Sequence, residues 1–132
     1  GEMTDGRKHD HIGLAAKNLE ETVAFYTGIL GFEVVGECTA PDGTPIKFLR
    51  NGGLNYEIFQ PAGEMAPGQA EKVDHVSYVS DDIEEDYRWF MENGYECTTD
   101  GIEALDSAWE KGCRYFKIKG PGGEEIEFDQ IV

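Results

Sequence analysis

Apolar residues recur along the chain with two periodicities, that of a strand and that of a helix, and the same succession of the two occurs twice. In each half, a short apolar strand is followed by a helical pattern and then by three further strands. The predicted strands cover 11–16, 32–39, 45–50 and 54–60 in the first half and 73–80, 95–99, 113–119 and 124–132 in the second. The predicted helices begin at Asn18 and Asp82 and end at Gly31 and Gly94. Each half is therefore expected to fold as a βαβββ unit.

Both predicted helices carry a start signal and one apolar stripe. Asn18 and Asp82 can cap the free N–H groups of the first turn, and a glutamate three residues later completes a capping box. The stripes comprise Leu19, Val23, Tyr26 and Leu30 in the first helix and Ile83, Tyr87, Phe90 and Met91 in the second. We expect each helix to bury its stripe against its own sheet. The stretch 100–112 is longer than the matching turn of the first half and predicts a helical turn around 105–110.

Alternation along the strands assigns the other face of each sheet to a group of polar side chains. His11 shares a face with Gly13, whereas Ile12 points to the opposite side, and Glu127 is likewise separated from Phe128. The apolar faces suit the helices, so the polar faces are left to line a cup between the halves. The expected fold class is α+β, with two βαβββ modules that form a curved-sheet cup. We expect a single domain over 1–132, with module 1 at about 9–60, a linker at 61–71 and module 2 at about 72–132.

Each half also offers one histidine near its start and one glutamate near its end, at equivalent places in the repeat. The pairs are His11 with Glu57 and His75 with Glu127. Both glutamates are flanked by apolar residues on their strands, which predicts that the carboxylates are buried. A buried carboxylate requires a partner, and a cation would provide one. The repeat therefore predicts a metal site with four ligands.

Charge and cysteine content limit the classes of molecule that the protein is expected to bind and the compartment in which it is expected to work. Eleven Lys and Arg against 27 Asp and Glu give a net charge of −16 and a pI near 4.3. This field argues against nucleic acid and anionic membranes, and it requires local positive charge or a metal wherever an anionic substrate binds. There is no apolar run of the length of a membrane span, and the three cysteines form no CxxC motif, so we expect a cytoplasmic protein.

Several short motifs resemble the vicinal oxygen chelate superfamily, which includes glyoxalase I, methylmalonyl-CoA epimerases, bleomycin- and fosfomycin-resistance proteins and extradiol dioxygenases. The resemblance extends from about residue 11 to residue 130. It rests on His11-Ile12-Gly13-Leu14, Phe25-Tyr26, Leu30-Gly31-Phe32, Asp74-His75-Val76, Asp81-Asp82-Ile83 and Gly120-Pro121-Gly122-Gly123 before Ile126-Glu127. The similarity is closest to glyoxalase I-like proteins.

That resemblance implies a ligand set and a reaction. The ligands are His11, Glu57, His75 and Glu127, a set that suits Ni²⁺, Zn²⁺, Co²⁺ or Mn²⁺. The activity implied is that of a metal-dependent lyase or isomerase, similar to lactoylglutathione lyase, acting through an enediolate. Its substrate would be a small oxygen-chelating compound such as a 2-oxoaldehyde hemithioacetal. Glu127 is the first candidate for the catalytic base, and Glu57 is the second.

Two other functions stay open. One is an enzyme similar to methylmalonyl-CoA epimerase, and the other is a non-catalytic protein of the same fold that binds small molecules or antibiotics. Retention of all four ligand-type residues favours an enzyme. The arginine and asparagine pattern with which glyoxalase I holds glutathione is missing, so the identity of the thiol is left open.

Three further residues are candidates for substrate binding. Arg50 and Arg114 lie on predicted strands, where they either pair with the surplus acids or bind a substrate carboxylate. Trp109, in the longer loop of the second half, could close over the cup or make an apolar contact that caps a helix. The expected partners are a small-molecule substrate and, as in resembling proteins, a second copy of the chain in a homodimer.

Overall fold

The computed structural model describes residues 6–63, 72–121 and 123–132. Each half begins with one strand and one helix. The first half comprises β1 (His9–Ala15), α1 (Leu19–Gly28), β2 (Glu33–Thr39), β3 (Pro45–Asn51) and β4 (Leu54–Phe59). The second comprises β5 (Lys72–Val79), α2 (Ile83–Glu92), β6 (Glu103–Leu105), β7 (Cys113–Lys119) and β8 (Glu125–Ile131). Most of the predicted linker lies outside the described residues.

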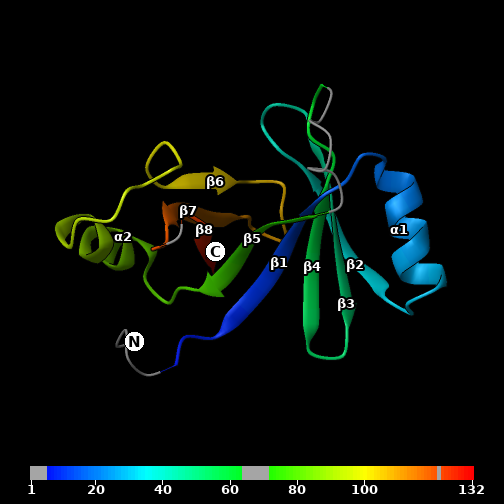
Figure 1. The fold of residues 1–132 in the computed structure, drawn as a ribbon, viewed down its shortest axis with the longest axis horizontal. Helices are drawn as coiled ribbons and strands as arrows, with labels where there is room; N and C mark the ends of the chain where they lie inside the picture. The colour runs from blue at the N-terminus through cyan, green and yellow to red at the C-terminus, as the bar shows by residue number, and fades with distance from the viewer. Residues whose placement is uncertain (1–5, 64–71, 122) are drawn as a thin grey trace.

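All eight strands belong to one curved sheet with the order β2-β3-β4-β1-β5-β8-β7-β6. Within each half, the first strand pairs in parallel with the last, β1 with β4 and β5 with β8. The halves join through an antiparallel pair of their first strands, β1 and β5, in the middle of the sheet (Figure 1). The expected α+β fold of two repeated units around a curved sheet is confirmed.

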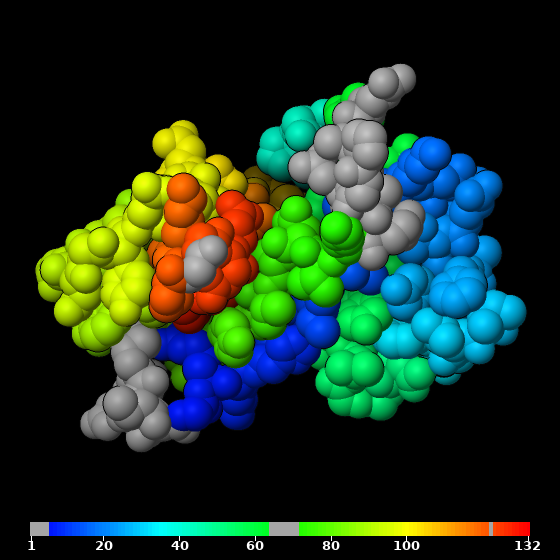
Figure 2. All heavy atoms as spheres, in the orientation of Figure 1, coloured from blue at the N-terminus to red at the C-terminus, as the bar shows by residue number. Residues whose placement is uncertain are grey.

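The two helices cover opposite ends of the sheet (Figure 1). One apolar cluster joins each helix to its own unit, as the stripes predicted. The buried residues include Leu14, Leu19, Leu49 and Ile58 at α1, and Ile83, Phe90, Phe116 and Phe128 at α2. Helix α1 ends at Gly28, earlier than expected, and Leu30 is 45% exposed rather than part of the stripe. The space-filling view shows α1 and α2 at the two ends of the molecule, with β5 between them (Figure 2).

Both helix starts are tied to the strand that ends their unit. Asn18 and Asp82 accept hydrogen bonds from the N–H groups of Glu21 and Glu85, as the capping signals predicted. In addition, the side-chain oxygen of Gln60 accepts from the N–H of Leu19 at 2.8 Å. Equivalently, Gln130 accepts from the N–H of Ile83 at 3.0 Å. These glutamines lie three residues after Glu57 and Glu127, so each helix start is fixed to a strand that carries a candidate ligand.

The second half departs from the prediction after its helix. The predicted strand over 95–99 is wrong: that segment contributes only a single bridge, Cys97 with Ile118, and the third strand is the three-residue β6 further on. Hydrogen bonds of the Thr99 side chain replace strand pairing here, because its hydroxyl donates to the carbonyl of Gly101 and accepts from the N–H of Lys117. Residues 106–111 form turns instead of the predicted helical turn.

A third apolar cluster closes the cup across the two halves. Ile46 and Phe48 of β3 contact Leu105, Ala108 and Cys113 of the second half. Beside them, Ser107 donates to the carbonyl of Thr39 at 2.8 Å and accepts from its N–H at 3.2 Å. The loop over 106–112 therefore joins the free edges of the sheet. Within the described residues, no helix has the length and apolar character that a membrane span requires.

Candidate metal centre

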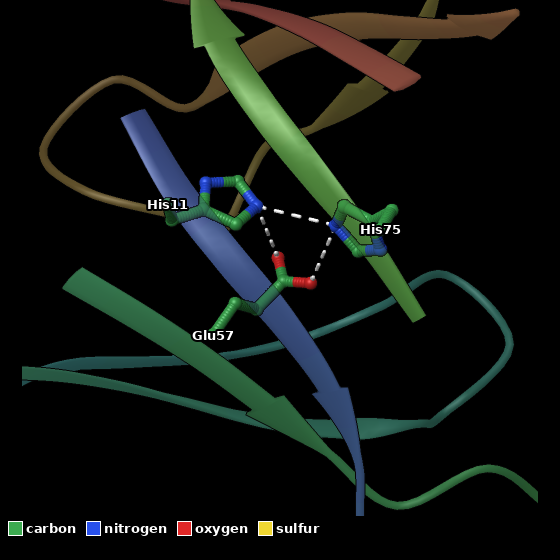
Figure 3. A group of neighbouring side chains, drawn as sticks. All are labelled: His11, Glu57 and His75. Carbon is green, nitrogen blue, oxygen red and sulfur yellow. Dashed lines mark hydrogen bonds and ion pairs between the residues drawn. The ribbon is translucent and has the colours of Figure 1, made fainter. Parts of the chain in front are cut away.

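Four strands in the middle of the sheet bring the predicted ligands to one place. His11 comes from β1, Glu57 from β4, His75 from β5 and Glu127 from β8. The register aligns them, because Gly13 of β1 is paired with both Glu57 and His75, while Ser77 of β5 is paired with both His11 and Glu127. The four side chains are buried, with exposed fractions of 3–7%. Figure 3 shows His11, Glu57 and His75 converging on one point.

The distances match those between the ligands of a single ion. The Nε2 atoms of His11 and His75 are 3.3 Å apart. Each carboxylate spans the two rings: Glu57 lies 3.8 Å from His11 and 3.5 Å from His75, and Glu127 lies 3.2 Å and 3.6 Å from them. Ligands that bind one ion at about 2 Å stand roughly 3–3.5 Å from one another. The donor set therefore fits a divalent transition-metal ion.

Each histidine is supported from behind by the aspartate that precedes it. Nδ1 of His11 donates to Asp10 at 2.6 Å, and Nδ1 of His75 donates to Asp74 at 2.8 Å. Donation from Nδ1 leaves Nε2 as the atom that faces the centre, and metal-binding histidines in proteins generally have such a partner. The sequence analysis missed this pair, although an Asp-His dipeptide stands in both copies of the repeat.

Electrostatics distinguish the two glutamates. Burial would raise the pKa of Glu127, but the hydrogen bond from His11 and the charges of both histidines outweigh it and hold that pKa at about 2. Burial dominates at Glu57 and raises its pKa, since the nearby histidine charges oppose it only in part and the charge of Glu127 adds to it. Burial alone would lower the pKa of His11, yet hydrogen bonds with Asp10 and Glu127 raise it well above the usual value. The pKa shifts of all three groups therefore share one cause, the burial of imidazoles and carboxylates side by side.

A third acid lies behind His11. Asp129 is buried two residues after Glu127, and within the described part of the chain its Oδ1 atom has no hydrogen-bond partner. Burial, together with the charges of Glu127 and Asp10, raises the pKa of Asp129 to about 8. A ligand-type oxygen of this residue also lies within 4.8 Å of those of Asp10 and His11. The surroundings of the centre are therefore rich in carboxyl groups, whose charge a proton or a bound cation would offset.

The ring of His75 occupies space that a glycine leaves free. A Cβ atom built on Gly13 would fall inside the imidazole of His75, so no larger residue fits at this position without displacing the ring. Gly13 is thus part of the centre through its missing side chain. The sequence analysis placed Gly13 on the cup face but did not assign it this role.

A cavity of about 620 Å³ opens onto the centre. Glu57, His75 and Glu127 form its floor. Its walls combine residues of the β2–β3 hairpin, among them Pro41, Asp42 and Ile46, with residues of the second half, among them Asp100, Glu103, Leu105, Tyr115 and Lys117. The site can therefore hold a small organic molecule directly above the ligand atoms.

The structure does not bring the predicted substrate-binding arginines to this cavity. Arg50 donates to the side chain of Asn55 at 2.7 Å in an exposed position at the end of β3. Arg114 points to the helix side of β7, where it pairs with Glu84 of α2 at 3.2 Å. Lys117, which the sequence analysis did not single out, is the basic residue that lines the cavity. Alternation along β7 could have indicated it, because Phe116 and Ile118 belong to the helix side.

Trp109 reaches the first half of the molecule, but it lies at the seam rather than over the cavity. Its ring lies 4.7 Å from that of Phe48 and contacts Gly36. Its backbone has a φ of 60°, a left-handed conformation that is costly for a large side chain. The contact with Phe48, whose ring is in turn 6.4 Å from that of His11, offsets this cost.

A two-unit curved sheet that gathers two histidines and two glutamates at its centre defines a protein of the vicinal oxygen chelate fold. The family model described as the Glyoxalase/Bleomycin resistance protein/Dioxygenase superfamily matches residues 8–128, and the chain belongs to that superfamily. The resemblance noted in the sequence is thereby confirmed.

Relatives of known sequence or structure are similar over different lengths. An uncharacterised protein of Bacillus subtilis (strain 168), YwbC, is 27% identical over 128 residues, which cover 94% of this chain and 98% of that protein. Human mitochondrial methylmalonyl-CoA epimerase is 32% identical over 59 residues, or 44% of this chain and 34% of that protein. A solved structure of a methylmalonyl-CoA epimerase with methylmalonyl-CoA and ammonium has a TM-score of 0.79 at 22% identity, covering 96% of this chain and 95% of that one. This last likeness concerns the fold.

Proposed function

We propose that this protein is a metal-dependent lyase or isomerase, similar to glyoxalase I, that acts through an enediolate on a small oxygen-chelating substrate. The observation that carries the proposal is the centre itself: two imidazoles 3.3 Å apart, each 3.2–3.8 Å from an oxygen of both glutamates and each supported by an aspartate. A substrate such as a 2-oxoaldehyde hemithioacetal presents two neighbouring oxygens and an acidic C–H bond, which is the chemistry that such a centre serves.

The ligands would be His11, Glu57, His75 and Glu127. Two nitrogen and two oxygen donors suit Ni²⁺, Zn²⁺, Co²⁺ or Mn²⁺. When bound, the ion would polarise the substrate carbonyl and stabilise the negative charge of the enediolate. The protein residues then have to orient the substrate, exclude water and move one proton.

Either glutamate can move that proton, because both carboxylates line the cavity floor. Glu127 is our first choice for the base, on the resemblance to glyoxalase I, and Glu57 is the second. The base removes the proton from the carbon next to the carbonyl. Delivery of the proton to the neighbouring carbon completes a glyoxalase-type isomerisation, whereas delivery to the same carbon completes an epimerisation.

Epimerisation is the second candidate function, and a specific observation favours it. The curated relative with the higher identity over its matched segment is the human methylmalonyl-CoA epimerase, at 32% over 59 residues. The same ligand set and the same base would serve, so the substrate decides between the two reactions. A binding protein without catalysis is the remaining alternative, but two buried carboxylates beside two imidazoles are poorly suited to an apolar drug.

Metal analysis and a substrate panel would test the proposal. Protein purified without chelator should contain about one equivalent of a divalent transition metal, and a chelator should abolish turnover. The panel would compare hemithioacetals made from several thiols with methylmalonyl-CoA, because the thiol is open. Turnover of a hemithioacetal supports the glyoxalase-type reaction, and turnover of methylmalonyl-CoA alone moves the function to epimerisation. Metal-free protein that turns over neither would overturn both.

The proposal is accompanied by an expected cellular location and an expected oligomeric state. We expect a cytoplasmic location, on the cysteine usage of the sequence. We also expect a homodimer. Light scattering at micromolar concentration would test this by giving the molecular mass in solution. The cup itself does not require a partner, because one chain supplies all four candidate ligands.

A further inference from the structure

The charges that line the cavity are mostly negative. Besides Glu57 and Glu127 on the floor, its walls carry Asp42, Asp100 and Glu103. Apart from His75, Lys117 is the one basic residue among the described residues of this lining. In a chain with a net charge of −16, a lysine beside the metal centre places a positive charge in an otherwise negative electrostatic field.

Lys117 is held in place without being saturated. Its ammonium lies 3.8 Å from Asp74 and 3.8 Å from Glu125, and its side chain is 19% exposed. Charge-assisted hydrogen bonds are about 2.7–2.9 Å long, so both pairs are loose. Lys119, two residues along the same strand, provides the contrast, because its ammonium lies 2.9 Å from Glu96 on the exposed surface. The described residues therefore leave the three N–H donors of Lys117 available to a ligand.

Its position directs those donors toward the space above the centre. Lys117 and Glu127 are directly paired between β7 and β8, and both side chains point into the cup. Cross-strand neighbours have Cβ atoms about 5 Å apart, so the lysine side chain reaches over the space beside the metal ligands. A substrate chelated at the centre would have its remaining atoms within reach of this ammonium.

We propose that Lys117 binds a carboxylate of the substrate, so that the substrate class is a small metal-chelating compound with a second, carboxylate-bearing end. This inference rests on the proposed metal-dependent function. A singly charged carboxylate is favoured over a doubly charged phosphate because Asp74, Glu125 and Glu127 surround the ammonium and repel additional negative charge. Lys117 thereby sets specificity, while the ligand residues supply the chemistry.

Two chelators that differ by one carboxylate would test the inference. The protein would be loaded with Co²⁺, whose visible spectrum changes when its ligands change, and titrated with acetohydroxamate and with the monohydroxamate of succinic acid. We expect the wild type to bind the carboxylate-bearing chelator roughly 10- to 100-fold more tightly. In Lys117→Gln this preference should disappear while acetohydroxamate binds as before, which also shows that the centre is intact. Lys117→Arg should retain part of the preference, and Lys119→Gln, the matched control, all of it.

The outcomes separate the two proposals. If the wild type binds Co²⁺ and both hydroxamates equally well, Lys117 does not bind a carboxylate, although the metal centre stands. The same conclusion follows if Lys117→Gln keeps the preference, because another group must then recognise the carboxylate. If the wild type binds neither Co²⁺ nor hydroxamate, the proposed function fails and the role of Lys117 fails with it.

Discussion

The two halves of the molecule agree at the centre of the sheet and differ at its edges. Each half contributes one histidine, one glutamate and one supporting aspartate at equivalent places. At the edge of the first half, β2 is a full strand of seven residues, whereas the equivalent β6 has three. The residues released from regular pairing in the second half, between 95 and 112, form a wall of the cavity and the seam that joins β6 to the first half.

This division separates two tasks. Features that the halves share build the metal centre. Each half brings its histidine and its glutamate there on its first and last strands, β1 and β4 in one half and β5 and β8 in the other. Features that they do not share, including Asp100, Glu103 and Lys117, line the space in which a substrate would lie. We infer that the repeated part determines which chemistry is available and the unrepeated part determines which molecule undergoes it.

The repeat is also unequal in its charges. Glu57 and Glu127 occupy equivalent places, but burial raises the pKa of Glu57, while the nearby histidines hold that of Glu127 at about 2. Equivalent positions in the sequence therefore do not imply equivalent roles in proton transfer.

The largest effect is expected from replacing the two glutamates one at a time, which would show whether they play the same part in turnover. Glu127→Gln keeps the shape and one coordinating oxygen but removes the base, so we expect turnover to fall by on the order of 10²–10⁴ while most of the metal is retained. Glu57→Gln should retain measurably more activity. Steady-state assays on whichever substrate of the panel is turned over, together with metal analysis, would measure both effects.

His75→Ala serves as the control for this pair, because loss of an imidazole ligand should remove metal and activity together. If Glu127→Gln turns over normally and Glu57→Gln does not, the base is Glu57. If both glutamine variants remain active, proton abstraction by a ligand carboxylate is not the mechanism, and the enediolate proposal has to be abandoned.

An intermediate effect is expected at the two aspartates behind the histidines. Asp10→Asn and Asp74→Asn should each weaken metal affinity by about 10- to 100-fold, because the amide no longer accepts the imidazole N–H as strongly. The loss should be greater for Asp10, since its contact is shorter, 2.6 Å against 2.8 Å, and its side chain is less exposed, 20% against 37%. Titration against a competing chelator would give both affinities.

Asp106→Asn, an exposed position outside the centre, is a suitable control for these variants and should leave metal affinity unchanged. Wild-type affinity in both Asp10→Asn and Asp74→Asn would show that the aspartates do not support a bound ion.

The smallest effect concerns the seam between the halves. Ser107→Ala removes the two hydrogen bonds to Thr39, and because the site is exposed we expect a loss of about 1 kcal/mol in the free energy of unfolding. Urea denaturation would measure it, with an unchanged m-value and unchanged metal content. A loss of metal in this variant would contradict the separation of tasks, because it would make the centre depend on the unrepeated loop.

Much of the fold was accessible from the sequence because its signals are local. The capping residues Asn18 and Asp82 and the alternation on β1 and β8 depend on nearest neighbours along the chain, and the structure agrees with them. The segment 95–99 was mispredicted because the Thr99 side chain takes the N–H of Lys117 and the carbonyl of Gly101, and a strand pattern does not reveal such side-chain bonds.

The site was accessible in part. The repeated histidines and glutamates were visible as a pattern, and the structure brings all four together, although metal binding by them stays a prediction. The aspartate behind His11 was missed because strict alternation places neighbours on opposite faces, whereas an irregular register between His9 and His11 lets Asp10 reach the ring. Arg50 and Arg114 were predicted to bind substrate from their charge alone. In the structure they contact Asn55 and Glu84, away from the cavity.

The glycine beneath His75 has a consequence for the history of the chain. In the register of β1 and β5, Gly13 is opposite His75, and the repeat-equivalent Ser77 is opposite His11. Ser77 keeps its side chain there, but any side chain at position 13 would collide with the imidazole. Two identical copies of the ancestral unit, each with serine at this place, could not form this centre. If the halves arose by duplication, glycine at position 13 was either inherited from the ancestral unit or acquired before the present site could form, whereas position 77 was free to carry serine.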